Sequence, residues 1–220
     1  MQLIDQFNRK IDYIRVSVTD RCDFRCVYCM SEKMTFLPRS TVLSLEEIER
    51  VIKVFTELGV KKVRITGGEP LVRKDIDKLF KSIGRIDALD EITLTTNGSQ
   101  LKSKSMMLKK AGVKRINISL DSLNPITFKK LTRTGDLQKV LDGIHTAIDV
   151  GFDKIKSNTV LMKNLNEEEI YSLVDYAIKY YLDISFIEEM PLGHTAYDRK
   201  STSVNNDDIL LKLKEKYLLS

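Results

Sequence analysis

Hydrophobic and polar residues alternate with a period of two in six segments of the chain, and a segment with helical spacing follows each of them. In the first segment Ile14, Val16 and Val18 alternate with Tyr13 and Arg15, which predicts a strand. The predicted strands cover 11–20, 61–66, 91–96, 114–121, 154–161 and 183–190. The predicted helices cover 44–59, 75–84, about 103–111, 136–151, 166–181 and about 206–217.

Helix ends are marked by capping residues. Ser44 and Glu47 have the spacing of a capping box, and Gly59 predicts the end of the same helix. Asn166 is the predicted cap of the fifth helix. The apolar face expected for the first helix consists of Ile48, Val51, Ile52 and Phe55.

Six βα units in succession predict a parallel sheet with right-handed crossovers, either as a closed or partly closed barrel or as an open, doubly wound sheet. Polar and glycine-rich residues follow every predicted strand, as they do around the active-site rim of a (β/α) barrel. We therefore predict a partial (β/α)6 TIM-like barrel. No linker rich in Pro, Gly or Ser divides it, so residues 1–220 are expected to form one domain.

Composition places the chain among ordinary globular proteins, with 42% hydrophobic and 30% charged residues. The formal net charge of +5 is spread along the chain, which favours a solvated surface over a nucleic-acid interface. The first ten residues, "MQLIDQFNRK", do not resemble a signal peptide, and no apolar run is long enough to span a membrane. An odd number of cysteines argues against disulfides, so we expect reduced thiols and a cytoplasmic protein.

All three cysteines, Cys22, Cys26 and Cys29, lie in the segment "RCDFRCVYCM". A structural zinc site needs four protein ligands, and the chain adds only two histidines to the three cysteines. His145 is expected to be a surface or partly packed residue, while His194 is the residue that would complete a Cys3His site. An iron–sulfur cluster fits better, because three thiolates hold three irons and leave a coordination position open for a small molecule.

The spacing C-x3-C-x2-C, with an aromatic residue before the last cysteine, resembles the signature of the radical S-adenosylmethionine (SAM) superfamily. The segment "TGGEP" (66–70), one βα unit later, resembles the element that holds the methionyl amino group of SAM. The resemblance implies a [4Fe–4S] cluster on the three cysteines, SAM on the open iron, and a 5′-deoxyadenosyl radical. We expect Glu69 to accept hydrogen bonds from the ammonium group, and the two glycines to let the backbone approach the ligand.

Longer segments resemble the GTP 3′,8-cyclase family of molybdenum cofactor biosynthesis. These are "IRVSVTDRCDFRCVYCM", "VRITGGEPLVRKDI", "LTTNG", "RINISLDSL", "IKSNTV" and "FIEEMPLG". The resemblance implies that the radical abstracts the 3′ hydrogen of GTP and that the ribose carbon attacks C8, which gives (8S)-3′,8-cyclo-7,8-dihydroguanosine 5′-triphosphate. It assigns SAM contacts to Tyr28, Gly68, Ser119 and Met190. It assigns GTP contacts to Arg15, Arg64, Thr95 and Lys156.

The same resemblance implies partners: a flavodoxin- or ferredoxin-like electron donor and a downstream pyranopterin-forming enzyme, with a homodimer also compatible. Each site residue has a structural alternative. Arg15 and Lys156 would be outward-facing, Arg64 would pair with a carboxylate such as Glu69, and Met190 would fill the core. Two other functions remain open: another radical SAM enzyme that modifies a peptide or nucleotide, and a non-catalytic metal-binding module that engages nucleic acid.

The chain departs from the family pattern at several positions. Ser185 stands where the family usually has arginine, Glu189 where it has an apolar residue, and Ser31 where it has proline. No cysteine follows Cys29, whereas the family has three more that bind a second cluster near guanine. We therefore expect either a truncated form that is inactive as a cyclase by itself, or a protein that has lost this half of the site.

Overall fold

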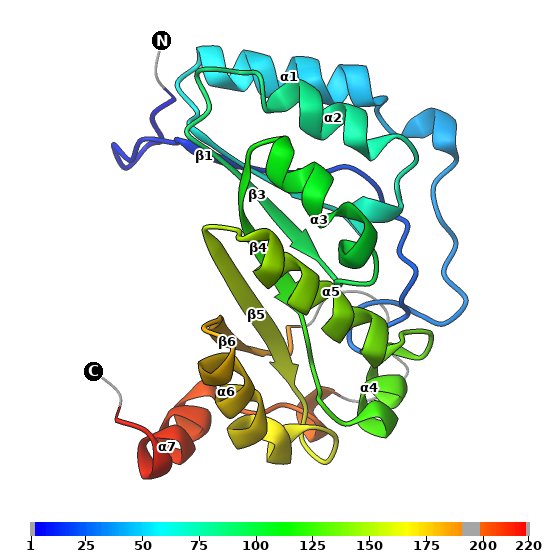
Figure 1. The fold of residues 1–220 in the computed structure, drawn as a ribbon, viewed down its shortest axis with the longest axis vertical. Helices are drawn as coiled ribbons and strands as arrows, with labels where there is room; N and C mark the ends of the chain where they lie inside the picture. Colours follow the sequence, from blue (N-terminus) through cyan, green and yellow to red (C-terminus); the bar gives the residue numbers. More distant parts are fainter. Residues whose placement is uncertain (1–2, 191–198, 219–220) are drawn as a thin grey trace.

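A computed structural model describes residues 3–190 and 199–218 of the protein. Six strands form a single sheet in the order β1-β2-β3-β4-β5-β6, and every neighbouring pair is parallel (Figure 1). The strands are β1 (Tyr13–Ser17), β2 (Lys62–Thr66), β3 (Glu91–Thr96), β4 (Val113–Ser119), β5 (Lys154–Leu161) and β6 (Asp183–Glu188). All six predicted strands are confirmed, with ends shifted by a few residues.

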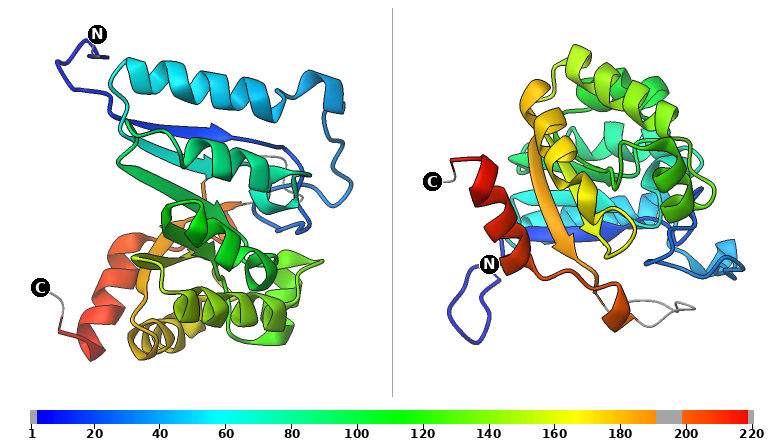
Figure 2. Two further views of the ribbon diagram at one scale, coloured as in Figure 1. Left: turned by 45° about the horizontal axis from the view of Figure 1, so that its top comes forward. Right: turned by 90° about the horizontal axis from the view of Figure 1, so that it is seen from below.

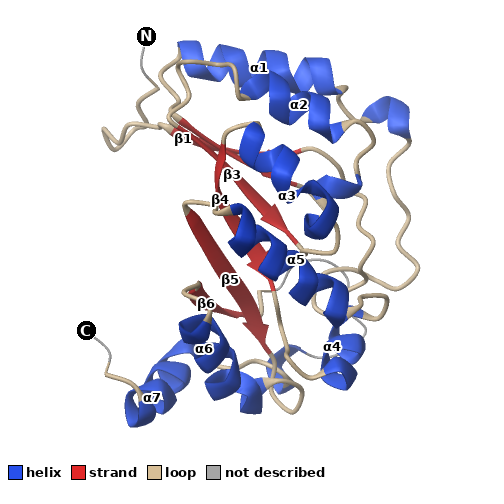
Figure 3. Cartoon of the chain, viewed as in Figure 1, coloured by secondary structure: helices blue, strands red, loops and turns tan. Residues whose placement is uncertain are grey.

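Helices cover the convex face of the sheet and leave its concave face free of helices (Figures 2 and 3). The α-helices are α1 (Leu45–Glu57), α2 (Ile76–Ile83), α3 (Leu101–Lys110), α4 (Pro125–Thr132), α5 (Leu137–Val150), α6 (Ile170–Lys179) and α7 (Asn206–Lys216). Short 3-10 helices are η1 (Arg39–Thr41), η2 (Pro70–Val72), η3 (Glu167–Glu169) and η4 (Arg199–Ser201). No helix in the described part of the chain is both long and apolar enough to cross a bilayer.

The sheet is an incomplete barrel. β1 and β6 lie at the two ends of the strand order, and no pairing joins them among the residues that the structure describes. A parallel sheet that curves this way brings the carboxyl ends of all its strands to one rim. The predicted partial barrel is therefore confirmed.

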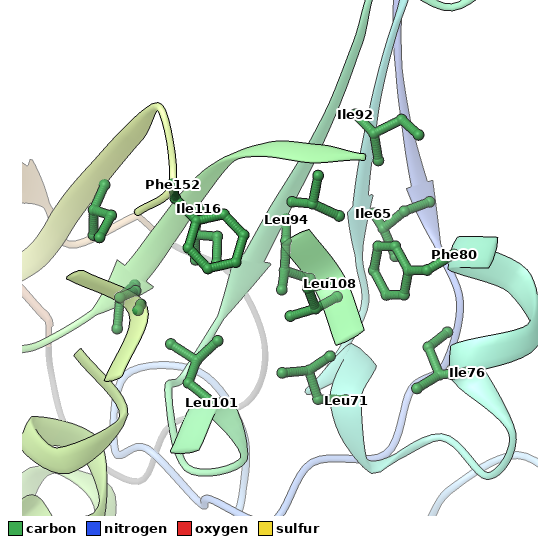
Figure 4. Close-up of a cluster of buried hydrophobic side chains, with 14 of the residues drawn as sticks. Ile65, Leu71, Ile76, Phe80, Ile92, Leu94, Leu101, Leu108, Ile116 and Phe152 are labelled. Atoms are coloured by element: carbon green, nitrogen blue, oxygen red, sulfur yellow. The ribbon is translucent and has the colours of Figure 1, made fainter. Parts of the chain in front are cut away.

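The core lies between the convex face of the sheet and the helices. In β2, Val63 and Ile65 are fully buried, whereas Arg64 between them is half-buried on the other face. Side chains of α2 and α3, such as Phe80 and Leu108, pack close to the strand residues Ile65 and Leu94 (Figure 4). The period-two pattern thus divides each strand into a core side and a concave side.

The capping box of α1 is present as predicted. The Ser44 hydroxyl accepts a hydrogen bond from the Glu47 amide (3.1 Å), and the Glu47 carboxylate accepts one from the Ser44 amide (2.7 Å). The predicted apolar face was wrong at Val51, whose side chain is 38% exposed. Ile48, Ile52 and Thr56 form the buried stripe instead, because the helix turns its i, i+4, i+8 row toward the sheet.

Asn166 does not cap a helix through its side chain. The Asn166 side chain is 1% exposed, and its amide group donates to the carbonyl oxygens of Asp121 (2.7 Å) and Val160 (2.9 Å). Its Oδ1 accepts from the Met162 amide at 2.8 Å. Asn166 therefore ties the loop after β5 to the loop after β4, a role that depends on tertiary neighbours.

Helix α4 was not predicted. Asn124 caps it by accepting hydrogen bonds from the amides of Ile126 (2.9 Å) and Thr127 (3.2 Å), and Pro125 is its first residue. Asn followed by Pro is a known helix-start signal, so the sequence did contain the evidence. The short helix matters because the cysteine segment packs against its carboxyl end.

Candidate active site at the carboxyl ends of the strands

The cysteine loop, which we define as residues 20–31, follows β1 and lies against the end of α4 (Figure 1). The amides of Arg25 and Val27 donate to the carbonyls of Thr132 (3.0 Å) and Leu131 (2.9 Å). The Phe24 ring meets Phe128 edge to face, with centroids 6.0 Å apart. These contacts fix the backbone of the loop on a folded support.

A second support comes from the end of β2. The Gly68 amide donates to the Thr19 carbonyl (2.7 Å), and the Glu69 amide donates to the Arg21 carbonyl (2.8 Å). A Cβ atom placed on Gly68 would lie 2.4 Å from the Arg21 carbonyl oxygen. The glycine is therefore required for close approach to the cysteine loop itself, in addition to any approach to a ligand.

The third support is the loop after β3. The side-chain amide of Asn97 donates to Asp23 Oδ1 (2.6 Å) and lies 3.8 Å from Cys22 Sγ, and the Ser99 hydroxyl donates to Asp23 Oδ2 (2.6 Å). The Thr134 hydroxyl donates to the Asp23 carbonyl at 2.7 Å. Asp23 thus joins the cysteine loop to two neighbouring segments. The sequence analysis expected polar residues after this strand but did not identify Asn97 or Asp23.

The three thiols lie in a site of partial burial. Cys22 and Cys26 are half-buried and Cys29 is exposed. Burial raises the pKa of Cys22 to about 11, and it raises the pKa of Cys26 and Cys29 as well. The Phe24 amide donates to Cys22 Sγ at 3.3 Å, which partly opposes the shift. Thiolates at these positions therefore need a positive partner, and a metal centre supplies one.

This donor set fits a cluster better than a single ion. Among the residues that the structure describes, no three His, Cys, Asp or Glu side chains converge on one metal position. A cubane holds each cysteine on a different iron, so three thiolates within eight residues would surround one cluster instead of binding one ion. His145 takes no part, because its ring stacks against Tyr180 (centroids 4.9 Å apart) and Tyr176, as expected for a packed residue. His194 lies outside the described residues.

Tyr28 is anchored through its hydroxyl group. It donates to Asp121 Oδ2 at 2.6 Å, and Asp121 Oδ1 accepts from the Val160 amide at 2.9 Å. Burial raises the pKa of Asp121 to about 6, although both hydrogen bonds favour the carboxylate. Because the Tyr28 hydroxyl is already occupied, a contact with SAM would come from its ring or its backbone.

Glu69 has internal partners that its sequence motif did not predict. Its side chain is fully buried, and its carboxylate accepts hydrogen bonds from the Leu71 amide (2.9 Å), the Thr96 hydroxyl (2.8 Å) and the Asn97 amide (2.6 Å). Burial raises the pKa of Glu69 to about 7 against the opposing effect of these donors. These donors join the ends of β2 and β3 through Glu69, and Oε2, which accepts from the Asn97 amide alone, retains capacity for one further donor.

Glu69→Gln tests that structural role. An amide places an N–H group against backbone N–H donors, so we expect the free energy of unfolding to fall by about 1–3 kcal/mol. Chemical denaturation of the metal-free protein measures the change. Glu57→Gln, at an exposed position of α1, is the matched control and is expected to change stability little. Equal stability of the two variants would contradict the assignment.

The predicted GTP contacts share the concave face of the sheet. Arg15 and Arg64 are register partners on β1 and β2, and Arg64 Nε donates to Thr93 Oγ1 at 3.3 Å. Thr95 and Lys156 lie on the same face, on β3 and β5. Arg15 is exposed and Arg64, Thr95 and Lys156 are half-buried. Their side chains are therefore positioned to reach a ligand held inside the curve of the sheet.

On the concave face, ion pairs form near the amino ends of the strands but not around the predicted GTP contacts in the described part of the chain. Near the amino ends of the strands, Lys62 lies 4.0 Å from Glu91, and Asp183 pairs with Arg115 (3.8 Å) and Lys154 (2.9 Å). Within the described part of the chain, no carboxylate forms an ion pair with Arg15, Arg64 or Lys156. The structural alternative for Arg64, a pair with Glu69, is therefore wrong. An anion such as a phosphate would complete this face.

The two remaining predicted residues lie at the rim. Ser119 ends β4 on the concave face, opposite Asn158 in the register. Met190 follows β6 and its side chain is 56% exposed, so the alternative of a core-filling methionine is wrong. The preceding Glu189 carboxylate accepts from Arg199 Nε (3.2 Å) and the Thr202 hydroxyl (2.8 Å). The Glu189 carboxylate is therefore bound by residues in and next to η4.

Comparisons with known proteins agree with this geometry. Residues 16–177 match the profile of the Radical SAM superfamily. The chain is 52% identical over 219 residues to GTP 3′,8-cyclase of Saccharophagus degradans, covering 99% of this chain and 66% of the relative. It is 51% identical over 220 residues to GTP 3′,8-cyclase 2 of Pseudomonas aeruginosa, covering 100% of this chain and 66% of the relative. The chain thus spans just under two thirds of the length of these relatives.

Solved structures share the fold. The Streptococcus suis protein SuiB bound to its precursor peptide SuiA superimposes with a TM-score of 0.72 at 23% identity, covering 94% of this chain and 47% of SuiB. SuiB bound to S-adenosylmethionine gives a TM-score of 0.68, also at 23% identity, covering 94% of this chain and 45% of that chain. At these identities the similarity establishes the architecture alone.

Proposed function

The chain belongs to the radical SAM superfamily, and from that membership we propose that it performs the radical chemistry of a GTP 3′,8-cyclase. The observation that carries the proposal is the pairing of two features in one sheet. A three-cysteine loop lies at the carboxyl rim, and cations that form no ion pair with any described residue lie on the concave face below it. Members of the superfamily use a [4Fe–4S] cluster on three cysteines together with SAM.

In this proposal Cys22, Cys26 and Cys29 hold the cluster. Gly68, Ser119 and Met190, with the ring or backbone of Tyr28, contact SAM at the rim. The buried carboxylates of Glu69 and Asp121 lie near the same rim and favour a cationic ligand there, as the sulfonium and ammonium groups of SAM are cations. When bound, the cluster and SAM supply a 5′-deoxyadenosyl radical, and the protein's task is to bind, orient and exclude water.

The substrate end of the proposal rests on Arg15, Arg64, Thr95 and Lys156. Guanidinium groups bind phosphate oxygens in pairs, and the lysine ammonium adds a point charge. A triphosphate held by these cations places the attached ribose toward the rim, where the radical forms. Orientation of this kind contributes a large part of the rate in reactions between two bound partners.

Similarity in fold to SuiB, whose structure holds the precursor peptide SuiA, raises a peptide as an alternative substrate class. The identity of 52% to a GTP 3′,8-cyclase, against 23% to SuiB, favours the nucleotide.

We further propose a flavodoxin- or ferredoxin-like reductant, a downstream pyranopterin-forming enzyme and a cytoplasmic setting. A homodimer remains a prediction, as does the assignment of residues 1–220 as one radical SAM core domain.

The test uses GTP that carries deuterium at C3′. Reduced, cluster-loaded protein is incubated anaerobically with SAM and this GTP, and mass spectrometry follows 5′-deoxyadenosine and the cyclic nucleotide. One arm uses residues 1–220, and a second joins them to the part of the Saccharophagus degradans relative that the match does not cover. We expect SAM cleavage in both arms, and deuterated 5′-deoxyadenosine with cyclic product in the second. Cleavage without any deuterium transfer would exclude GTP as the substrate.

A further inference from the structure

Buried polar atoms without hydrogen-bond partners gather on the concave face of the sheet. Among the described residues, five buried side-chain nitrogen or oxygen atoms have no partner. Three of these, Thr95 Oγ1, Arg115 Nε and Asn117 Oδ1, belong to residues of that face. Folded proteins satisfy nearly all such atoms, because each unpaired one costs about 1–3 kcal/mol. Three on one open face therefore mark the place where a bound ligand or water would complete them.

Asn117 occupies the centre of this group. Its side chain is 4% exposed, and it is the register partner of Thr95 on one side and of Lys156 on the other. Neighbouring strands lie about 4.8 Å apart, so the three side chains form a continuous row across β3, β4 and β5. A ligand that contacts both Thr95 and Lys156 must cross Asn117.

The chemistry of the free atom limits what it binds. Asn117 Oδ1 accepts hydrogen bonds, and so it needs a donor. Phosphate oxygens at neutral pH are acceptors, whereas ribose hydroxyls are donors. Asn117 lies beside Lys156, a proposed phosphate contact, and one step before Ser119 on the same face, a proposed SAM contact. The part of a nucleotide that fits between a phosphate site and the radical source is its sugar.

We propose that the Asn117 side chain accepts a hydrogen bond from a ribose hydroxyl of the nucleotide substrate and so positions the sugar for hydrogen abstraction. This inference rests on the proposed function and adds a residue to its site. Asn117 had no role in the sequence analysis, since an asparagine within a strand has no motif of its own. Only the register and the missing partner identify it.

Isothermal titration calorimetry on Asn117→Ala tests the contact without any turnover. We expect affinity for GTP to fall about threefold to tenfold, the usual worth of one hydrogen bond. The loss should disappear when the titrant is the deoxynucleotide, 2′-deoxy-GTP or 3′-deoxy-GTP, that lacks the contacted hydroxyl. Binding of inorganic triphosphate should be unchanged.

Stability separates this role from a structural one. Removing a buried acceptor that has no partner should leave the melting temperature of the protein unchanged or raised, while a structural asparagine would lower it. Ser157→Ala is the matched control, because Ser157 Oγ is also buried and unpartnered but faces the helices. It should leave GTP binding unchanged. Lys156→Ala should weaken GTP and inorganic triphosphate alike.

Several outcomes would overturn the inference. The first is an unchanged GTP affinity in folded Asn117→Ala. The second is an affinity loss, relative to wild type, that is as large for 2′-deoxy-GTP and 3′-deoxy-GTP as for GTP. The third is weaker SAM binding with GTP binding intact. Asn117→Ser repeats the test with a smaller change in volume if the alanine variant does not fold. Wild-type protein that binds inorganic triphosphate but shows no affinity for GTP would instead contradict the proposed function.

Discussion

Cys26→Ala is expected to abolish both cluster binding and SAM cleavage. Cys26 is the central ligand of the three, and its carbonyl accepts hydrogen bonds from the amides of Cys29 (3.0 Å) and Met30 (3.2 Å). Those backbone bonds do not involve the thiol, so the loop can keep its shape in the variant while one iron loses its ligand. Two cysteines leave two irons without protein ligands, and the cluster should not survive purification.

Iron and sulfide analysis, visible absorption and 5′-deoxyadenosine formation measure this loss after anaerobic reconstitution. We expect cleavage to fall to the background of the reaction without protein. Ser31→Ala, two residues after Cys29, is the control and should load iron as the wild type does. Circular dichroism of the metal-free variants shows whether the fold is kept. A full cluster in Cys26→Ala would mean that these thiols are not its ligands.

Gly68→Ala is expected to damage the site by displacing backbone. The added Cβ would lie 2.4 Å from the Arg21 carbonyl oxygen and 2.7 Å from that of Asp20. Both neighbours are main-chain atoms, so no side-chain rotation relieves the clash. The variant must separate the end of β2 from the cysteine loop, and the hydrogen bond from the Gly68 amide to the Thr19 carbonyl (2.7 Å) lengthens. Overpacking of this kind costs about 1–3 kcal/mol or more.

The consequence for function should exceed the consequence for stability. We expect little cluster loading in Gly68→Ala, since the loop that carries all three cysteines moves with the clash. Gly112→Ala is the matched control, because nothing lies within 4 Å of its Cβ and only its positive φ of 86° opposes the substitution. An alanine at this positive φ lowers the free energy of unfolding by about 1–2 kcal/mol. It should leave the iron content of the protein unchanged. Equal iron content in the two variants would contradict the role of Gly68 in holding the cysteine loop against the end of β2.

The site divides its charges between two levels. Buried carboxylates of Glu69 and Asp121 lie at the rim near the cysteine loop, and the cations Arg15, Arg64 and Lys156 lie on the concave face. Under the proposed function, a cationic cosubstrate and an anionic substrate would each meet opposite charge. Because the two levels belong to the same strands, one sheet would fix the distance between the two proposed ligands.

The sequence alone predicted the strands, most helices and the rim. Period two in β1 to β6 and capping signals such as Ser44 with Glu47 are local, so they can be read without knowing the fold. The cysteine spacing predicted the cluster for the same reason, because its ligands lie within eight residues of one another. Helix α4 was missed although Asn124 and Pro125 marked its start.

The tertiary structure decided what long-range contacts control. The motif "TGGEP" did not show that Glu69 joins two strands, because its donors Thr96 and Asn97 lie more than 25 residues away along the chain. The register of β3, β4 and β5 placed Asn117 between Thr95 and Lys156, which no local pattern encodes. Motifs record neighbours along the chain, whereas burial and partner atoms depend on strands that meet only after folding. For that reason the sequence determined the chemistry at the rim, and only the folded sheet determined which side chains are free to bind.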